Sequence, residues 1–191
     1  VGDLGISISN LEFTPDGFSL VYVRGNTKNR QGESANPGLL DEDTDQAIFI
    51  HSLNKSKKTK ISKGSRPSIS HDGSTIAFVK EGQIWTAPLN DSIRQPKKLF
   101  NIRGSQSDIN WSPNDNYLAF TSSRSDNSYI GIYSFKDKKV VFMDPSVDRD
   151  FSPEWSPNNK KVAFIRRPYA KDVPPFSPQK IARPWSMRVL D

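Results

Sequence analysis

A short acidic run has the residue types and spacing that come nearest to a metal site. Asp41, Asp43 and Asp45 occupy the first, third and fifth positions of a calcium-binding loop, where carboxylate oxygens supply the ligands. The rest of the loop does not fit, because Gln46 stands where the sharp turn needs Gly and Ser52 where a bidentate Glu is needed. We therefore expect a solvated loop here and no metal site.

Nucleophilic catalysis also lacks its residues. A serine hydrolase of the α/β type needs Gly-x-Ser-x-Gly, and the nearest matches, which begin at Gly5 and Gly17, lack the second Gly. The two histidines, His51 in a strand pattern and His71 in a turn, are best explained as structural. Cysteine is absent, which excludes thiolate catalysis, disulfides and Cys-bound zinc. The sequence therefore predicts no catalytic residue and no cofactor.

Two long polar inserts hold the residues best suited to binding. The first covers residues 24–46 and is rich in Gly and Asn, and the second covers residues 166–184 and contains five prolines. Loops on a rigid scaffold are where binding residues concentrate. The candidates for contact with a substrate or a partner domain are Arg24, Arg30, Arg166, Arg167 and Tyr169.

A repeated unit positions these inserts. Four anchors, Phe13, Ile69, Trp111 and Trp155, each close a short strand before a polar turn and an apolar run, and they lie 56, 42 and 44 residues apart. Pro presets φ at the second turn position, and Asp, Asn or Gly tolerates the left-handed conformation that follows, so each unit reads as a hairpin. A period of roughly 40 to 50 residues built from short strands is typical of propeller blades.

A third and a fourth strand complete the unit. Third strands are predicted at 47–53, 83–89, 129–135 and 185–191, where β-branched, aromatic and small residues lie between polar turns. A Lys-rich turn and a fourth short strand follow the first three. We therefore predict an all-β chain that forms a partial β-propeller of about four blades, each a four-stranded antiparallel sheet. The blades are expected at roughly 1–62, 63–102, 103–145 and 146–191.

Large apolar side chains are expected to form the core between blades. Truncating Trp111 or Trp155 should cost about 3–5 kcal/mol. Short acidic side chains ahead of the hairpins are expected to accept backbone N–H bonds and to be structural: Asp108, Asp144, Asp148 and Asp150. The expected core residues are Phe13, Ile69, Trp85, Trp111, Trp155 and Trp185.

The positive charge is concentrated in turns. The formal net charge is +6, and lysines gather near the predicted third-to-fourth-strand turns and, as Lys160 and Lys161, in the last hairpin. In a propeller these turns project from one face. That face either binds a polyanion or a membrane surface, or is solvated and keeps sheet edges from pairing. We favour the solvated alternative and expect no nucleic-acid partner. No run of 18 apolar residues is present, so no transmembrane helix is expected.

The ends of the chain raise two further expectations. The chain opens at Val1 without Met or an apolar signal region, which is expected of a processed chain or of a piece of a longer one. Blade four ends at Asp191 after its third strand. We expect the segment Ile6 to Ser9 to fill the place of the missing fourth strand, either within the chain or from a neighbouring copy.

Several segments carry a resemblance to a known family. The segments "NLEFTPDGFSLVYV", "RPSISHDGSTIAFVKEGQIWTAPL" and "DRDFSPEWSPNNKKVAFIRRP" resemble the start of the propeller in secreted bacterial members of the prolyl oligopeptidase family, of the dipeptidyl-peptidase-like branch. The "VRGN…NRQGE…NP" insert and the terminal "RRP…RPW" segment point to this branch, while the "WSP" hairpins are shared with TolB-like propellers. The resemblance covers nearly the whole chain.

This resemblance implies a non-catalytic role. In the family a propeller precedes an α/β-hydrolase domain and limits access to its active site, so the chain would be the first four blades of such a cap. The remaining blades and the hydrolase domain are missing, and the Glu pair that holds a substrate amino terminus is not matched. The implied partners are that hydrolase domain and, through it, a peptide substrate, and the implied location is the periplasm or the cell exterior.

An alternative function and a tendency to self-associate follow from the same fold. The alternative is a stand-alone TolB-like propeller that mediates protein–protein contacts in the cell envelope. Four blades form either a small closed ring or an arc with two open ends, and an arc would expose apolar blade faces of the kind that usually recruit a partner. We therefore expect the isolated chain to self-associate by pairing its open edges.

Overall fold

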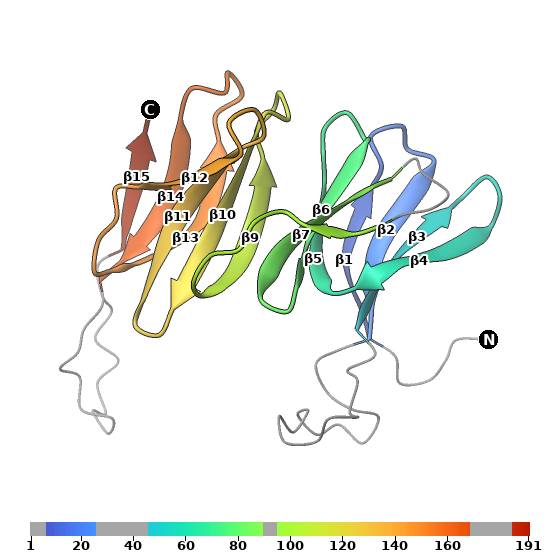
Figure 1. The fold of residues 1–191 in the computed structure, drawn as a ribbon. Coiled ribbons are helices and arrows are strands. Elements are labelled where there is room, and N and C mark those ends of the chain that lie inside the picture. Colours follow the sequence, from blue (N-terminus) through green and yellow to red (C-terminus); the bar gives the residue numbers. More distant parts are fainter. Residues whose placement is uncertain (1–6, 26–45, 90–94, 169–184) are drawn as a thin grey trace, which may run out of the picture. The chain divides into compact units, whose positions relative to one another are not determined.

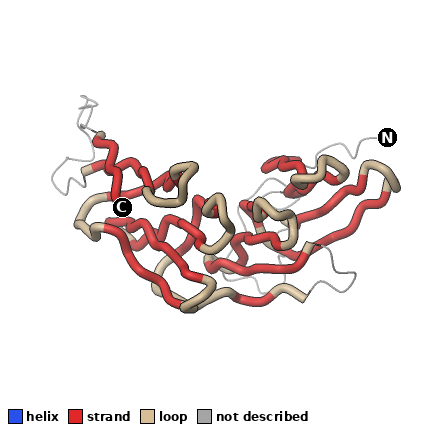
Figure 2. Tube along the Cα trace, turned by 90° about the horizontal axis from the view of Figure 1, so that it is seen from above, coloured by secondary structure: helices blue, strands red, loops and turns tan. Residues whose placement is uncertain are grey.

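The described part of the chain consists of strands and turns. The computed structural model describes residues 7–25, 46–89, 95–168 and 185–191 (Figure 1). These residues contain no helix (Figure 2), and so none that could cross a membrane. The chain divides into two compact units, Val1–Phe100 and Asn101–Asp191.

The first unit contains two four-stranded antiparallel sheets, here called blades one and two. Blade one consists of β1 (Ile8–Phe13), β2 (Ser19–Arg24), β3 (Ala47–Ser52) and β4 (Lys57–Lys63). Blade two consists of β5 (Ser65–Ile69), β6 (Thr75–Lys80), β7 (Gln83–Pro88) and β8 (Lys97–Lys98). In both blades each strand pairs with the next along the chain, as in a propeller blade.

The second unit contains blades three and four. Blade three consists of β9 (Ser105–Trp111), β10 (Tyr117–Arg124), β11 (Asn127–Ser134) and β12 (Lys139–Met143), and blade four of β13 (Arg149–Trp155), β14 (Val162–Arg167) and β15 (Ser186–Leu190). One parallel bridge, between Ser128 and Arg149, joins the two into a seven-stranded sheet. The predicted all-β fold of repeated antiparallel sheets is confirmed, and the four hairpins lie at the four predicted anchors.

One hydrogen-bond pattern closes all four hairpin turns. In blade three the Ser112 hydroxyl donates to Asn114 Oδ1 (2.8 Å) and accepts from the Tyr117 N–H (2.9 Å), while the Ser112 N–H donates to the Tyr117 carbonyl (3.0 Å). Asp115 takes the left-handed conformation with φ of 58°. The same bonds are made from the equivalent residues of the other turns, Thr14, Ser70 and Ser156. The turns are therefore clamped by a hydroxyl and by the Asp or Asn two residues later.

The two turns of the first unit use Asp where the second unit uses Asn. The Thr14 hydroxyl donates to Asp16 (2.6 Å) and the Ser70 hydroxyl to Asp72 (2.6 Å). These hydroxyl bonds, with backbone N–H bonds from Phe18 and Ser74, lower the pKa of both carboxyl groups. Each group therefore stabilises the folded state fully above its unfolded pKa of about 4, and this contribution is lost as the pH falls through the lower folded pKa.

We expect an Asp16→Asn/Asp72→Asn variant to lose less stability than the wild type on acidification below about pH 4, because the amide makes the same bonds without titrating. Urea unfolding between pH 2 and pH 5 measures this. The reverse variant, Asn114→Asp/Asn158→Asp, is the matched control and should add acid sensitivity to the second unit. Parallel pH profiles for wild type and first variant would contradict the assignment. Burial raises the pKa of the Glu12 carboxyl group. The effect of Glu12 on folding stability therefore has the opposite sign to that of Asp16 and Asp72, since it is lost as the pH rises, and it occurs at a higher pH.

A β-bulge interrupts the first strand of every blade. Asn10, Arg66, Asp108 and Ser152 have φ between 48° and 55°, and each lies three residues before its hairpin anchor. The strand register shifts at the same places. In the second unit the bulge also links blades, since Asp108 Oδ2 accepts from the Thr121 hydroxyl (2.9 Å) and the Ser152 N–H (3.4 Å).

Each unit has its core between its two blades. In the first unit Val23 and Ile48 of blade one form one buried cluster with Ile76 and Phe78 of blade two. In the second unit Ile130 of blade three packs with Val162 and Phe164 of blade four. Gly131 permits close packing in blade three, because a Cβ there would lie 2.4 Å from the buried ring of Phe120.

The predicted core residues divide into three groups. Ile69 and Trp111 are buried, with 6% and 5% of their surface exposed, as expected. Trp85 and Trp155 are partly buried and pack against the cores of their units. The expectation of burial is wrong for Phe13 and Trp185, which are 62% and 57% exposed, because neither lies between two blades of its own unit.

The first strand of the chain does not take the place expected for it. Ile8 and Ser9 pair with Arg24 and Val23 of β2, so the described part of the segment Ile6 to Ser9 belongs to blade one. The expectation that it completes blade four is therefore wrong. The Gly25 N–H also donates to the Ser7 carbonyl (2.8 Å), which extends this pairing with β2.

Candidate functional site at the arginine edge of blades three and four

Four arginines gather along one edge of the second unit, here called the arginine edge. Arg124 ends β10 and Arg167 follows Arg166 at the end of β14, while Arg149 begins β13. β11 and β13 run parallel and are bridged at Ser128 and Arg149, so the starts of these strands and the ends of β10 and β14 lie at the same edge. The long insert after β14 leaves blade four from this edge.

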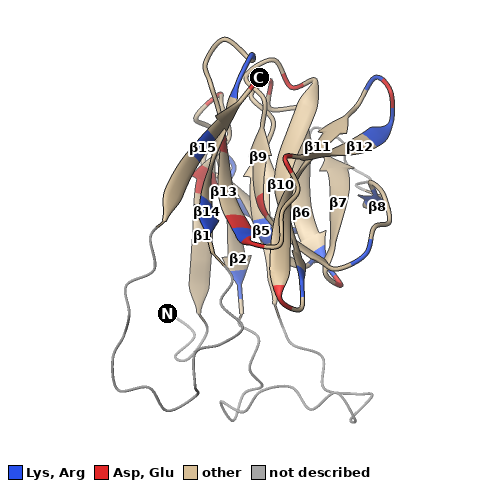
Figure 3. Cartoon of the chain, turned by 90° about the vertical axis from the view of Figure 1, so that its left-hand side faces the viewer, with Lys and Arg blue, Asp and Glu red and all other residues tan. Residues whose placement is uncertain are grey.

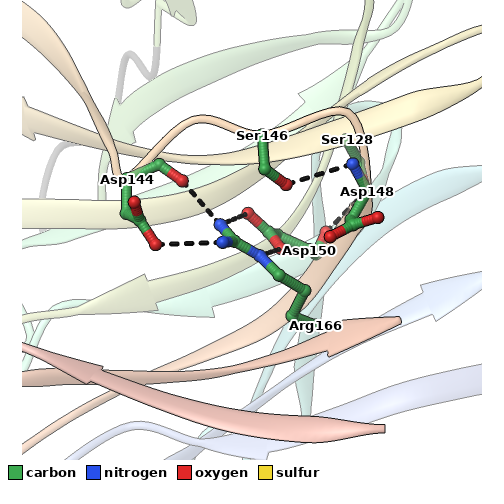
Figure 4. Close-up of polar contacts among 6 residues, drawn as sticks. All are labelled: Ser128, Asp144, Ser146, Asp148, Asp150 and Arg166. Carbon is green, nitrogen blue, oxygen red and sulfur yellow. Dashed lines mark hydrogen bonds and ion pairs between the residues drawn. The ribbon is translucent and has the colours of Figure 1, made fainter. Parts of the chain in front are cut away.

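Arg166 lies in a buried ion pair with Asp150, its direct cross-strand partner (Figure 4). The Arg166 Nε donates to Asp150 Oδ1 (2.7 Å) and the Nη2 to Oδ2 (2.8 Å), which is the two-pronged geometry of the strongest arginine–carboxylate pairs. Asp150 is fully buried and Arg166 is 5% exposed. The bonds to Asp150 raise the pKa of the Arg166 guanidinium further above its usual value. The prediction of Arg166 as a docking residue is therefore wrong.

The same guanidinium ties blade four to the end of blade three. Arg166 donates from Nη1 to Asp144 Oδ2 (2.9 Å) and from Nη2 to the Asp144 carbonyl (2.5 Å), and Asp144 directly follows β12. The Ser128 hydroxyl of β11 donates to the Asp150 carbonyl (2.6 Å). Arg166, Asp144, Asp150 and Ser128 therefore form a structural lock between the blades (Figure 4), here called the Arg166 lock.

Arg149 and Arg167 remain at the surface and face each other. They are direct cross-strand partners, and both are partly exposed. Like charges in opposite strand positions repel, so this pair concentrates positive charge at the edge. Arg149 donates from Nε to the Asp126 carbonyl (3.1 Å), and Arg167 lies over the ring of Trp185, 5.9 Å from its centroid. Both guanidinium groups are thus held in place.

Arg124 was not predicted from the sequence. Its guanidinium lies over Tyr129 and Phe142, 4.9 and 5.4 Å from the ring centroids, and its buried Nε has no hydrogen-bond partner among the described residues. The short segment that carries it looks like an ordinary polar turn. Its position at the end of a second strand, shared with Arg24 and Arg167, is the signal that could have found it.

The other predicted binding residues belong to the first unit or lie outside the described residues. Arg24 ends β2 in the first unit and is partly exposed. Arg30, Tyr169 and the acidic run with the calcium-like spacing lie outside the described ranges. In the ranges that are described, no group of three metal-ligating side chains comes together.

The lysines in the described turns of the second unit lie at the opposite edge from the arginines. Lys136 and Lys138 belong to the turn after β11, and Lys160 and Lys161 to the turn after β13. Because β11 and β13 run parallel, both turns leave the same edge. Basic residues, drawn in blue, mark both the β11–β12 turn and β14 in Figure 3. Lys161 is paired with Asp191.

Comparisons with known proteins place the chain among β-propellers. No protein-family model and no curated protein matches the sequence. Among solved structures, TolB from Acinetobacter baumannii is similar over 97% of this chain and 41% of its own, with 23% identity and a TM-score of 0.62. The β-propeller domain of the Trilobed protease from Pyrococcus furiosus is similar over 97% of this chain and 55% of its own, with 17% identity and a TM-score of 0.66.

A peptidase is also among the similar structures. The acylaminoacyl peptidase from Pyrococcus horikoshii matches over 90% of this chain and 29% of its own, with 18% identity and a TM-score of 0.62. The chain therefore spans between 29% and 55% of the length of these three structures. The fold is that of a β-propeller, present here as four blades, and its structural neighbours include TolB and propeller-containing peptidases.

Proposed function

We propose that this chain is the non-catalytic propeller region of a prolyl-oligopeptidase-like serine peptidase. It docks on a C-terminal α/β-hydrolase domain and limits the access of peptides to it. The observation that supports this best is the similarity of the four consecutive blades to structures of peptidases. The chain covers 55% of the propeller domain of the Trilobed protease and 29% of the acylaminoacyl peptidase. The resemblance of the two inserts to those of secreted bacterial members supports the same branch.

The arginine edge is the surface we assign to docking. Arg149 and Arg167 are held by a carbonyl and by an indole ring, so they offer fixed cationic groups. Arginine in a fixed geometry suits recognition of carboxylates, which occur on protein surfaces and at peptide carboxyl termini. Blade four carries both arginines, and the Arg166 lock holds this blade to the end of blade three.

A peptidase assay and the gene sequence test this proposal together. The pure chain should not hydrolyse Pro-containing dipeptide substrates, and measurable hydrolysis would overturn the non-catalytic role. The reading frame beyond the codon for Asp191 should encode further blades and then Gly-x-Ser-x-Gly. In that full-length protein, Arg149→Ala/Arg167→Ala should change KM for peptides more than kcat, while Lys136→Ala/Lys138→Ala at the opposite edge should change neither.

The second candidate is a TolB-like propeller that binds a partner protein in the cell envelope. The structure with the highest identity of those given above, 23%, is a TolB, and it also matches over 97% of this chain. The gene separates the two candidates, because this one requires no hydrolase domain after the propeller. Both candidates imply a periplasmic or secreted protein, and a fusion of the full-length protein to a periplasm-dependent reporter tests that location.

A further inference from the structure

One corner of blade one combines lysines with an exposed aromatic ring. Lys55 lies in the turn after β3, Lys57 and Lys58 begin β4, and all three are exposed. Phe18, in the turn between β1 and β2, is 56% exposed. Its carbonyl accepts the N–H of Leu53, which directly follows β3, so the two turns lie side by side (2.9 Å). Phe18 and the three lysines are here called the Phe18 corner.

The exposure of Phe18 belongs to its position in the turn. Ser74, Asn116 and Lys160 hold the same position in the other blades, since each N–H donates to the Asp or Asn that clamps its own turn. Blades two and four each have a preceding blade in their own unit, yet Ser74 and Lys160 still reach solvent. A neighbouring blade therefore does not cover this position, and the other three blades have polar residues there.

The backbone that carries the Phe18 ring is held at both of its polar groups. The Phe18 N–H donates to Asp16 Oδ1 (2.9 Å), and the Phe18 carbonyl accepts from Leu53. The ring is therefore presented to solvent from a fixed turn. A preorganised apolar group loses less conformational freedom on binding than one on a mobile segment.

Positive charge beside this ring is little offset by acidic residues. The segment 51–63, "HSLNKSKKTKISK", contains five lysines and no Asp or Glu, and Asp16 adds one negative charge in the neighbouring turn. The corresponding turn of blade three contains Asp137 among its lysines, and Lys161 of blade four is paired with Asp191. The Phe18 corner thus differs from the other lysine-bearing turns in both charge and apolar content.

Two simpler explanations account for the lysines but not for the ring. β4 is an edge strand among the described strands of blade one, and lysines on an edge prevent pairing with other chains. A soluble polyanion would likewise need only the lysines. The surface of an anionic bilayer uses both kinds of group, because lysines attract the headgroups and an aromatic ring enters the boundary between headgroups and acyl chains.

We propose that the Phe18 corner binds the surface of an anionic lipid bilayer. The Phe18 ring enters the headgroup boundary, and Lys55, Lys57 and Lys58 lie against the lipid phosphates. This contact is peripheral, since it is made by two turns. It does not rest on the peptidase or the TolB-like candidate, because it needs neither a hydrolase domain nor further blades.

Co-sedimentation of the whole chain with vesicles tests this proposal. At about 0.15 M salt, vesicles of phosphatidylglycerol and phosphatidylcholine should bind the chain and vesicles of phosphatidylcholine alone should not. Lys55→Gln/Lys57→Gln/Lys58→Gln should lower the partition coefficient about a hundredfold, since each lysine at the surface contributes about fivefold. Phe18→Asn, which introduces the residue of blade three, should lower it on the order of tenfold.

Two matched variants control for loss of charge and of apolar surface. Lys63→Gln removes an exposed lysine about 20 Å from Lys57 along the same strand. It should change the partition coefficient less than about twofold, because that distance exceeds the Debye length. Val141→Asn removes an exposed apolar side chain of β12 and should leave binding unchanged. All the substituted side chains are exposed, so circular dichroism should remain that of the wild type.

A site-specific label separates a lipid surface from a general polyanion surface. The chain has no cysteine, so Asn54→Cys and Lys63→Cys each accept one polarity-sensitive fluorophore. Anionic vesicles should shift the emission to the blue at position 54, beside the lysines, and not at position 63. A wild type that ignores anionic vesicles would overturn the proposal, as would equal shifts at the two positions. Phe18→Asn binding as tightly as the wild type would indicate a polyanion surface and would overturn it too.

Discussion

Replacing Asp150 with Ala is expected to destabilise the unit of blades three and four by about 3–5 kcal/mol. The substitution leaves the guanidinium of Arg166 buried, with only Asp144 beside it, and a buried charge without its main partner is costly. The loss should appear as a lower urea midpoint of the second unit, and fluorescence of Trp111 and Trp155 follows that unfolding.

Two further variants separate the Arg166 lock from a general effect of mutation. Removing both charges in Asp150→Leu/Arg166→Met should restore most of the lost stability, because an apolar pair of similar volume leaves no buried charge. Lys161→Ala breaks an exposed ion pair with Asp191 and should cost less than about 1 kcal/mol. An Asp150→Ala variant as stable as Lys161→Ala would show that the buried pair is not needed for folding.

Replacing Trp111 with Ala is expected to cost about 3–5 kcal/mol. The indole is 5% exposed, lies opposite Leu118 in the hairpin, and stacks on Phe135 with the ring centroids 5.2 Å apart. Truncation removes this contact and leaves a cavity that the rigid sheet cannot fill. Urea unfolding followed by circular dichroism measures the loss, since this method does not depend on the tryptophan that is removed.

The matched control for Trp111 is an exposed apolar residue of the same blade. Val141→Ala removes a side chain that is 62% exposed and should change stability by no more than about 0.5 kcal/mol. Trp111→Phe keeps a stacking ring and should lie between the two. Equal stability of Trp111→Ala and Val141→Ala would contradict the place of this residue in the core.

The strands and turns could be predicted because their signals are local. Each hairpin is specified within about ten residues by an anchor, a Ser or Thr, an Asp or Asn and an apolar run, and all four occur where predicted. The turn chemistry was only half recognised. Pro and the left-handed residue were read from the sequence, whereas the hydroxyl of residues such as Ser112, which makes the central bonds, was not.

The side chains that were misplaced depend on contacts far along the chain. Arg166 follows a strand and precedes a polar insert, which suggested a surface position, but Asp150 and Asp144, which enclose it, come from two other segments. Phe13 has the same local pattern as Ile69 and Trp111, yet it is exposed because β1 has no preceding blade in its unit. Local pattern identifies an interface residue but not whether the interface is occupied.

The bulges illustrate a third kind of limit. Arg66 and Ser152 are unusual residues for a left-handed conformation, so residue type alone gives no signal there. The signal is instead positional, since each bulge lies three residues before an anchor. Comparison of blades within one sequence, rather than of residues within one window, would have found it.

The closure of each hairpin turn within six residues has a consequence for how such a chain can change in evolution. Since the bonds that close the turn from Ser112 to Tyr117 and its counterparts are made within the turn, a duplicated or deleted segment of about forty residues would carry a working turn with it. Gene duplication could therefore lengthen or shorten the array blade by blade, and selection would have to refit only the two surfaces that meet at the new junction.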